Sequence, residues 1–214
     1  MTDEQILNEL NKYTFYHRIK VKEDIYTRET ANKHFSHRKL FRYLDDIDFK
    51  NKKVLDIGCR DGIFSFYIEK NGAKEVIGID NNPEILASAR QRIDRLGLKN
   101  VSLIAENVSQ LSLPDESLDV VFFSQSLHHL DDPKSGFKEA ARILRPGGQV
   151  LVMELAAHCE DWVLEKLGHK WLGFEKETLL DFMQTAGFNQ LHSEILPFRR
   201  EELFQIMLAA GRKT

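Results

Sequence analysis

Polar residues follow four short apolar runs of this sequence, at the points where buried strands would end. These polar stretches are Asp56 to Gly62, Asp80–Asn81, Glu106–Asn107 and Ser124 to His129. Ligands of an open parallel sheet bind beyond the carboxyl ends of its strands. A carboxylate there can accept hydrogen bonds from both hydroxyls of a ribose, and an amide or acid can accept one from the amine of adenine. The order of the four stretches therefore predicts a site for a cofactor that carries a nucleoside.

The first stretch also indicates what else the cofactor carries. Its loop reads Gly58-Cys-Arg-Asp-Gly62, which is neither the Gly-x-Gly-x-x-Gly pattern of dinucleotide sites nor a Gly-Lys-Ser/Thr phosphate loop. Asp56 stands just before this loop, where an acid would repel a phosphate and attract a cation. S-adenosylmethionine carries an ammonium and a sulfonium group and no phosphate, so it is the cofactor that the loop predicts.

Strands and helices alternate through the middle of the chain, and this alternation must position the polar stretches. The predicted strands are Val54 to Ile57, Glu75–Asp80, Val101–Ala105, Asp119–Phe123 and Gln149–Glu154. Helical spacing of apolar residues follows Ile63, Pro83 and Pro133, the last helix running through Leu144. Such alternation predicts a parallel sheet that is covered by helices on both faces, with right-handed crossovers.

The last third of the chain extends this sheet. An amphipathic helix is predicted at Phe174–Ala186, and strands are predicted at 191–196 and 205–210. A charged connection, Arg199 to Glu202, suits an antiparallel pair at the sheet edge. We therefore expect an α/β fold with a single doubly wound, Rossmann-like sheet of seven strands over residues 51–214, mostly parallel with an antiparallel C-terminal edge pair.

Residues 1–50 differ from the rest, because they are rich in aromatic and charged residues and contain no glycine. Apolar spacing predicts one helix up to Leu10 and another at about 31–44. We expect this segment to be an N-terminal helical lid or extension on the main domain. It either covers the sheet edge only or contributes substrate contacts, for which Tyr16 and His17 are candidates.

Composition bounds the classes of partner. The 214 residues have a net charge of −3 and 29% charged residues, which gives no electrostatic reason to expect a nucleic-acid or membrane-surface partner. No apolar run approaches the roughly 20 residues that span a bilayer, and the acidic N-terminus lacks a signal core. Two scattered cysteines, Cys59 and Cys159, fit a reducing compartment. These features predict a cytoplasmic protein with no membrane insertion.

Several motifs, taken together, resemble the class I S-adenosylmethionine-dependent methyltransferases, and within them the group that includes the ubiquinone/menaquinone-pathway methyltransferases. The motifs are Val54–Gly62, Val76–Asp80, Leu113–Asp119, Leu127–Leu130 and Leu144–Gly148. The C-terminal tail is similar to small-molecule methyltransferases fused to arsenical-repressor-type regulators. The segment that begins Tyr16-His-Arg-Ile resembles, more weakly, the tRNA wobble-uridine carboxymethyltransferase group. Neither of these last two resemblances fixes a substrate.

The resemblance implies a role for each residue of the cofactor site. Asp56 and Gly58 would approach the methionine amino end, with Cys59, Arg60 and Gly62 completing the loop. Further along the chain, the implied contacts are Asp80 to the ribose, Asn81 to the adenine side, Asn107 to the adenine amine, the Val108 N–H beside it, and Ser124 to the methionyl part.

Two positions depart from the family pattern. The family loop usually reads Gly-x-Gly-x-Gly, and its middle glycine is here Arg60. Either the backbone tolerates a Cβ at this position or the cofactor sits slightly differently. The acid expected after the third strand is here Asn107, which keeps a carbonyl acceptor without the charge. We expect weaker selectivity for adenine and continued binding.

Histidines are the candidates for acid–base chemistry. His128 and His129 follow the fourth strand, and an imidazole with a pKa of about 6.5 is a plausible general base if the acceptor must lose a proton. The alternative is that this pair serves only packing. His158 and Trp171 join the two N-terminal aromatics as candidates for the acceptor pocket, with ordinary core packing as the alternative.

No metal site is expected. His34 and His37 can share a helix face and His158 adjoins Cys159, but no cluster shows ligand spacing. Two cysteines are also too few for arsenic chemistry. The predicted function is therefore methyl transfer from S-adenosylmethionine to a small-molecule acceptor by in-line displacement. The alternatives are a tRNA- or RNA-modifying enzyme and a non-catalytic, cofactor-binding regulatory protein.

Overall fold

The computed structural model describes residues 20–22, 25–26, 41, 43–197 and 204–214. The chain divides into two compact units, residues 1–47 with 200–203 and residues 48–199 with 204–214. In the first unit, β1 (Lys20–Lys22) and β2 (Ile25–Tyr26) form an antiparallel pair. This strand pair lies between the two helices that were predicted for the N-terminal segment, in keeping with its β-branched and aromatic residues. The helices expected there lie outside the described residues, except at positions 41 and 43–44, which are helical.

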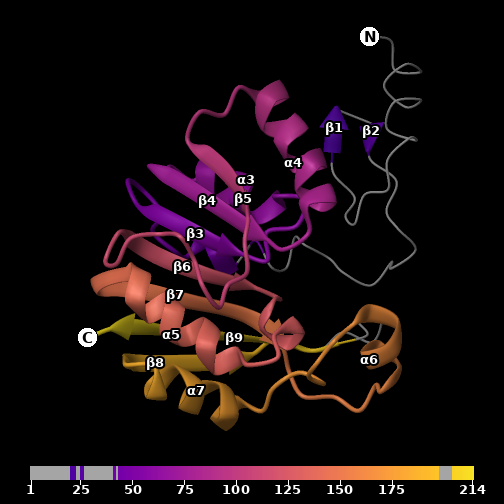
Figure 1. Ribbon diagram of the computed structural model, residues 1–214, viewed down its shortest axis with the longest axis vertical. Coiled ribbons are helices and arrows are strands. Elements are labelled where there is room, and N and C mark those ends of the chain that lie inside the picture. The colour runs from indigo at the N-terminus through magenta and orange to yellow at the C-terminus, as the bar shows by residue number, and fades with distance from the viewer. Residues whose placement is uncertain (1–19, 23–24, 27–40, 42, 198–203) are drawn as a thin grey trace. The chain divides into compact units, whose positions relative to one another are not determined.

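The second unit contains a seven-stranded sheet with the order β5-β4-β3-β6-β7-β9-β8. The strands are β3 (Lys53–Ile57), β4 (Glu75–Asp80), β5 (Val101–Ala105), β6 (Leu118–Ser124), β7 (Leu144–Leu155), β8 (Phe188–Ile195) and β9 (Ile206–Lys213). The pairs from β5 to β7 are parallel, and β9 is antiparallel to both β7 and β8. This confirms the predicted fold class, including the antiparallel pair at one edge (Figure 1).

Helices cover both faces of the sheet. Phe122 and Phe123 are consecutive on β6, so their side chains point to opposite faces. Phe122 meets Phe64 of α3 (Ile63–Lys70) edge-on, with ring centroids 5.7 Å apart. Phe123 meets Phe137 of α5 (Pro133–Ile143) at 5.1 Å. These two contacts show that α3 and α5 lie on opposite faces of the sheet.

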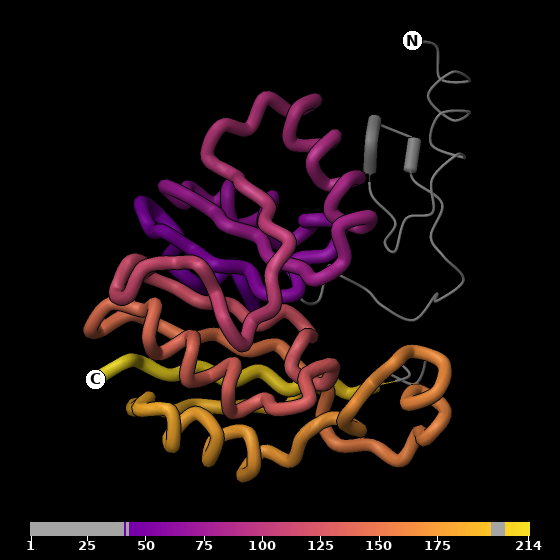
Figure 2. Tube along the Cα trace, viewed as in Figure 1, coloured from indigo at the N-terminus to yellow at the C-terminus, as the bar shows by residue number. Residues whose placement is uncertain are grey.

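Four further helical segments lie in the described part of residues 48–214. They are α4 (Pro83–Leu96), η1 (Leu127–His129), α6 (Trp162–Leu167) and α7 (Lys176–Thr185). The tube in Figure 2 shows α7 running beside α5 over the β7–β9 part of the sheet. Within the described residues, no helix combines the length and the apolar composition that a membrane span requires.

Three strand ends differ from the sequence prediction by more than one residue. β7 begins at Leu144 and includes the Pro146-Gly-Gly148 segment that was expected to be a turn, because Leu144 pairs with Leu118 across an irregular register. β8 begins at Phe188, and β9 reaches Lys213 opposite it. Gln190, with a φ of 49°, lies in the register shift of this pair. Such irregularities interrupt the strict alternation by which a strand is recognised in sequence.

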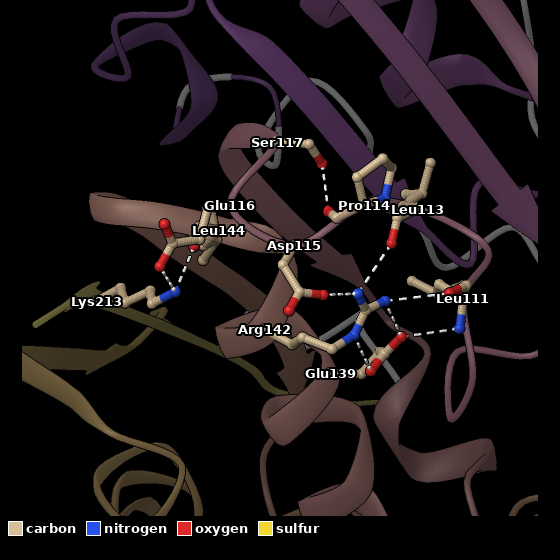
Figure 3. Close-up of polar contacts among 10 residues, drawn as sticks. All are labelled: Leu111, Leu113, Pro114, Asp115, Glu116, Ser117, Glu139, Arg142, Leu144 and Lys213. Carbon is tan, nitrogen blue, oxygen red and sulfur yellow. Dashed lines mark hydrogen bonds and ion pairs between the residues drawn. The ribbon is translucent and has the colours of Figure 1, made fainter.

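One arginine fixes the connection between β5 and β6. Arg142 on α5 donates to the carbonyl oxygens of Leu111 and Leu113, at 3.1 and 2.9 Å, and pairs with Asp115 and Glu139 (Figure 3). Its planar guanidinium can make all of these bonds at once, which a lysine ammonium cannot. In this chain, the motif Leu113–Asp119 therefore has a structural role, namely to hold the loop that leads into β6.

Candidate functional site

The sheet reverses its winding between β3 and β6. Ile57 pairs with Phe123 at the carboxyl ends of these two parallel strands. From here β4 and β5 continue to one side, and β7 to the other. The polar stretches that begin at Asp56 and Ser124 therefore lie at the topological switch point, where open α/β sheets bind ligands.

The loop after β3 has the backbone of a glycine loop. Gly58 and Gly62 both have a φ of 78°, and a Cβ added at Gly58 would lie 2.6 Å from the Cβ of Ser126. Arg60 has a φ of 49°, so it adopts the left-handed conformation that the family pattern assigns to glycine. The backbone thus tolerates a Cβ at this position, at a cost of roughly 1–2 kcal/mol.

Asp80 holds this loop against β4. Its Oδ2 accepts from the backbone N–H of Arg60 at 3.1 Å, and its Oδ1 accepts from that of Asn82 at 2.9 Å. Asn82 in turn caps α4 by accepting from Glu84 and Ile85, which fixes the turn that contains Asn81. Asp80 is only partly buried. Its carboxylate therefore links two loops of the site and keeps lone pairs available for a ligand hydroxyl.

Asp56 is the buried acid of the site. It is fully buried, and its Oδ2 accepts from the Ser65 hydroxyl at 2.6 Å. Burial raises the pKa of Asp56 to about 7, and the charges of Asp80 and Asp61 add to this, against the lowering effect of the Ser65 bonds. Its Oδ1 is buried and has no hydrogen-bond partner among the described residues. A cationic donor at this oxygen would satisfy both its hydrogen bonding and its charge.

Cys59 and the stretch after β5 make contacts within the chain itself. Cys59 is buried beside Gly78, and burial raises the pKa of its thiol, so Cys59 is a packing residue of the loop. The Oδ1 of Asn107 accepts from both the N–H and the hydroxyl of Ser109, each at 3.0 Å. The expected acceptor for adenine is therefore already engaged in a local turn, because a carbonyl oxygen has two lone pairs. Val108 is buried next to it.

The stretch after β6 leads into a group of histidines. Ser124 is buried, and the short helix η1 follows it with His128 and His129. The ring centroid of His128 lies 4.3 Å from that of His129 and 4.2 Å from that of His169. His169 follows α6 in the chain. We call His128, His129 and His169 the histidine cluster. Sequence reasoning missed His169, because Gly168-His-Lys carries no local signal and only the fold brings it here.

Glu154, at the end of β7, orients His128. Its side chain is fully buried, and its Oε1 lies 2.5 Å from Nδ1 of His128. Burial acts to raise the pKa of Glu154, but the charge of His128 and hydrogen bonds from His128 and Leu155 leave it lowered. Both carboxylate oxygens of Glu154 accept from backbone N–H groups, so Nδ1 of His128 is the donor in this contact and Nε2 is the remaining ring nitrogen of His128. An acid within the apolar run 149–154 was the available sequence signal.

The other two histidines of the cluster are weak bases. Burial, followed by the charge of His128, lowers the pKa of His129 to about 4 and that of His169 to about 3. The charge of Arg60 also acts to lower the pKa of His129, so the glycine loop and the cluster are electrostatically coupled. As a base, His129 is thus poorly matched to neutral pH.

The residues that were expected to line the acceptor pocket have different surroundings in the structure. His158 packs on Phe204 at 4.6 Å, and its pKa is lowered by burial and, in part, by the charge of His128. Trp171 donates from Nε1 to the carbonyl of Leu130 at 2.9 Å and stacks on Phe174, so it packs the core beside α7. Tyr16 and His17 lie outside the described residues.

Comparison with known proteins decides the family. Residues 55–152 match the family model described as a methyltransferase domain. The chain carries a methyltransferase domain of the class I, S-adenosylmethionine-dependent family. This family uses S-adenosylmethionine as its methyl donor. The motif resemblance and the predicted cofactor are thereby confirmed.

Curated relatives match this methyltransferase domain over part of their length. The chain is 31% identical over 122 residues to a ubiquinone biosynthesis O-methyltransferase from Cronobacter sakazakii, covering 56% of the chain and 49% of the relative. It is 31% identical over 114 residues to phosphoethanolamine N-methyltransferase 3 from Arabidopsis thaliana, covering 52% and 23%. The chain thus spans about half or less of the length of these relatives.

A solved structure matches more of the methyltransferase fold. An S-adenosylmethionine-dependent methyltransferase from Mesorhizobium loti superposes with a TM-score of 0.69 at 20% identity, covering 83% of the chain and 97% of that structure. At this identity, the likeness supports the fold alone.

Proposed function

We propose that this protein transfers the methyl group of S-adenosylmethionine to a small-molecule acceptor by in-line displacement. The observation that carries the proposal is the pair of acids at the switch point, Asp56 and Asp80. Asp56 has a buried oxygen without a partner among the described residues, which fits the ammonium of the cofactor. Asp80 lies at the end of β4, where its carboxylate could accept hydrogen bonds from a ribose diol. The residues present therefore fit this cofactor.

The chemistry divides between cofactor and protein. The cofactor, when bound, supplies the activated methyl group. The chain positions the two reactants and excludes water. Gly58 keeps the loop close to the β6 exit, because a side chain there would collide with Ser126. Asp56 orients the amino end by charge, and Asp80 orients the ribose by hydrogen bonding.

The histidine cluster would form the part of the site that binds the methyl acceptor. If the acceptor must lose a proton, the Nε2 of His128 is the atom to take it, since Glu154 would stabilise the resulting imidazolium. Two of the relatives are a phosphoethanolamine N-methyltransferase and a ubiquinone biosynthesis O-methyltransferase. The first name denotes a small acceptor and the second the biosynthesis of a small molecule, which supports a small-molecule acceptor here.

A transfer experiment tests the proposal. We expect label from methyl-labelled S-adenosylmethionine to enter the small-molecule fraction of a cell metabolite extract when the protein is added, and total tRNA to remain unlabelled. The matched control is Asp80→Asn, which should lose most of the transfer. Label in the tRNA would contradict a small-molecule acceptor. Cofactor binding without label in any fraction would support a regulatory protein instead.

A further inference from the structure

The histidine cluster has the composition of a metal site. One ring nitrogen from each of His128, His129 and His169 lies within 4.8 Å of the other two. Nitrogens bound tetrahedrally to zinc, at about 2.0–2.1 Å from the metal, are about 3.3 Å from one another. Ring rotations and small loop shifts would therefore bring the three nitrogens onto one ion.

The hydrogen bonds around the cluster leave the right atoms for a metal. Nδ1 of His128 is bound by Glu154, so its Nε2 is the nitrogen that can coordinate. Nδ1 of His129 lies 3.4 Å from the carbonyl of Gly168, which leaves Nε2 of that ring as well. His169 is buried, and its Nδ1 has no hydrogen-bond partner in the part of the chain that is described. A buried, unpartnered ring nitrogen beside two other imidazoles is the observation that points to a ligand.

Glu154 supplies the outer shell that such sites use. Histidines that bind metals commonly donate their second ring N–H to a carboxylate, which fixes the ring and strengthens it as a ligand. The buried Glu154 makes this contact with His128 and is itself fixed by the backbone N–H of Leu127 and Leu155, at 2.9 and 2.7 Å. This carboxylate is therefore already held in place before any ion binds.

From this geometry we infer that His128, His129 and His169 bind one divalent transition-metal ion of the zinc type. Imidazole ligands suit zinc, copper, iron or nickel, whereas magnesium and calcium require oxygen ligands. Three protein ligands leave a fourth position open, as in catalytic zinc sites. The sequence prediction of no metal site relied on spacing, and spacing does not reveal a ligand that the fold delivers from after α6.

The place of the cluster suggests what the open position holds. His128 and His129 follow β6 at the switch point. In the proposed function, on which this step rests, the histidine cluster binds the acceptor. An acceptor with an oxygen donor, such as a phenol or a hydroxy acid, would bind the ion there. A metal ion lowers the pKa of a bound oxygen, so the ion would take over proton removal from His128.

Metal binding can be measured without any methyl transfer. Protein stripped with a chelator is titrated with Zn²⁺ alone by calorimetry, in the absence of cofactor and acceptor. We expect one ion per chain, at least 100-fold weaker binding in His129→Gln and in His169→Gln, and about 10–100-fold weaker binding in Glu154→Gln. His192→Gln, a change of an exposed histidine on β8, is the matched control and should bind as the wild type does.

Wild-type protein without stoichiometric Zn²⁺ binding would overturn the inference, as would binding that persists in both cluster variants. Co²⁺ bound to the wild type gives a second readout that needs no variant to fold. We expect the strong visible absorption of a four-coordinate ion, and the weak spectrum of a six-coordinate ion would also overturn the site. Because S-adenosylmethionine binding is measured separately, failure of the metal site leaves the proposed methyl transfer standing.

Discussion

Glu154→Ala should destabilise the protein by about 3–5 kcal/mol, because it breaks a buried charge-assisted network. The Glu154 carboxylate accepts from the backbone N–H groups of Leu127, His128 and Leu155 and from the imidazole of His128. Removing it leaves buried backbone donors unsatisfied and leaves Nδ1 of His128 without its acceptor. Denaturant unfolding of the metal-free, cofactor-free protein measures the loss. Glu154→Gln should lose less, since the amide retains one oxygen acceptor.

The control for this experiment is Glu194→Ala. Glu194 is an exposed carboxylate on β8, so its removal should change the free energy of unfolding by no more than about 0.5 kcal/mol. A loss below about 1 kcal/mol for Glu154→Ala would show that the network around the end of β7 contributes little. The short contact with His128 would then not position that ring.

Asp56→Asn should make the cofactor-free protein more stable at pH 8 and have little effect at pH 4. The pKa of Asp56 is about 7 in the folded chain against 3.8 as its ordinary value, so the folded state binds this proton more tightly. The resulting stabilisation is complete below pH 3.8 and is lost as the pH rises through about 7. A difference of about 3 pKa units corresponds to about 4 kcal/mol. Asparagine mimics the neutral acid and avoids this loss.

Unfolding free energies of the wild type and of Asp56→Asn, measured from pH 4 to pH 8.5, check this linkage. Asp181→Asn, which changes an exposed carboxylate on α7, is the control and should show a difference that does not vary across this range. If the gap between the wild type and Asp56→Asn is also constant with pH, Asp56 is ionised throughout. Burial would then not raise the pKa of Asp56 in the folded protein.

Local patterns predicted most of the parallel half of the sheet. Alternation of apolar runs with helical spacing depends on neighbouring residues only, so β3 to β6 and their polar ends could be placed from sequence. Gly58 and Gly62 likewise indicated the tight turn after β3, whereas the conformation of Arg60 was left open and is left-handed in the structure. These features are dictated by the few residues that form them.

Features that depend on distant partners could not be predicted. Glu154 reaches His128 across 26 residues, and His169 joins them only because α6 returns the chain to the end of β6. Asn107 was expected to face a ligand, but Ser109, two residues on, occupies its oxygen. In each case the contact is set by tertiary structure or by a competing local hydrogen bond. The residue type alone does not reveal such a contact.

Asp56 on β3 and Asp80 at the end of β4 should form the site that binds S-adenosylmethionine. Calorimetric titration of the protein with the cofactor tests this directly. We expect one molecule bound per chain, and binding weaker by at least about 1–2 kcal/mol in Asp80→Asn, the cost of a lost charge-assisted hydrogen bond. The control is Asp94→Asn, a change of an exposed acid on α4, which should bind as the wild type does. Equal affinity of Asp80→Asn and wild type, or no binding by the wild type, would contradict the claim.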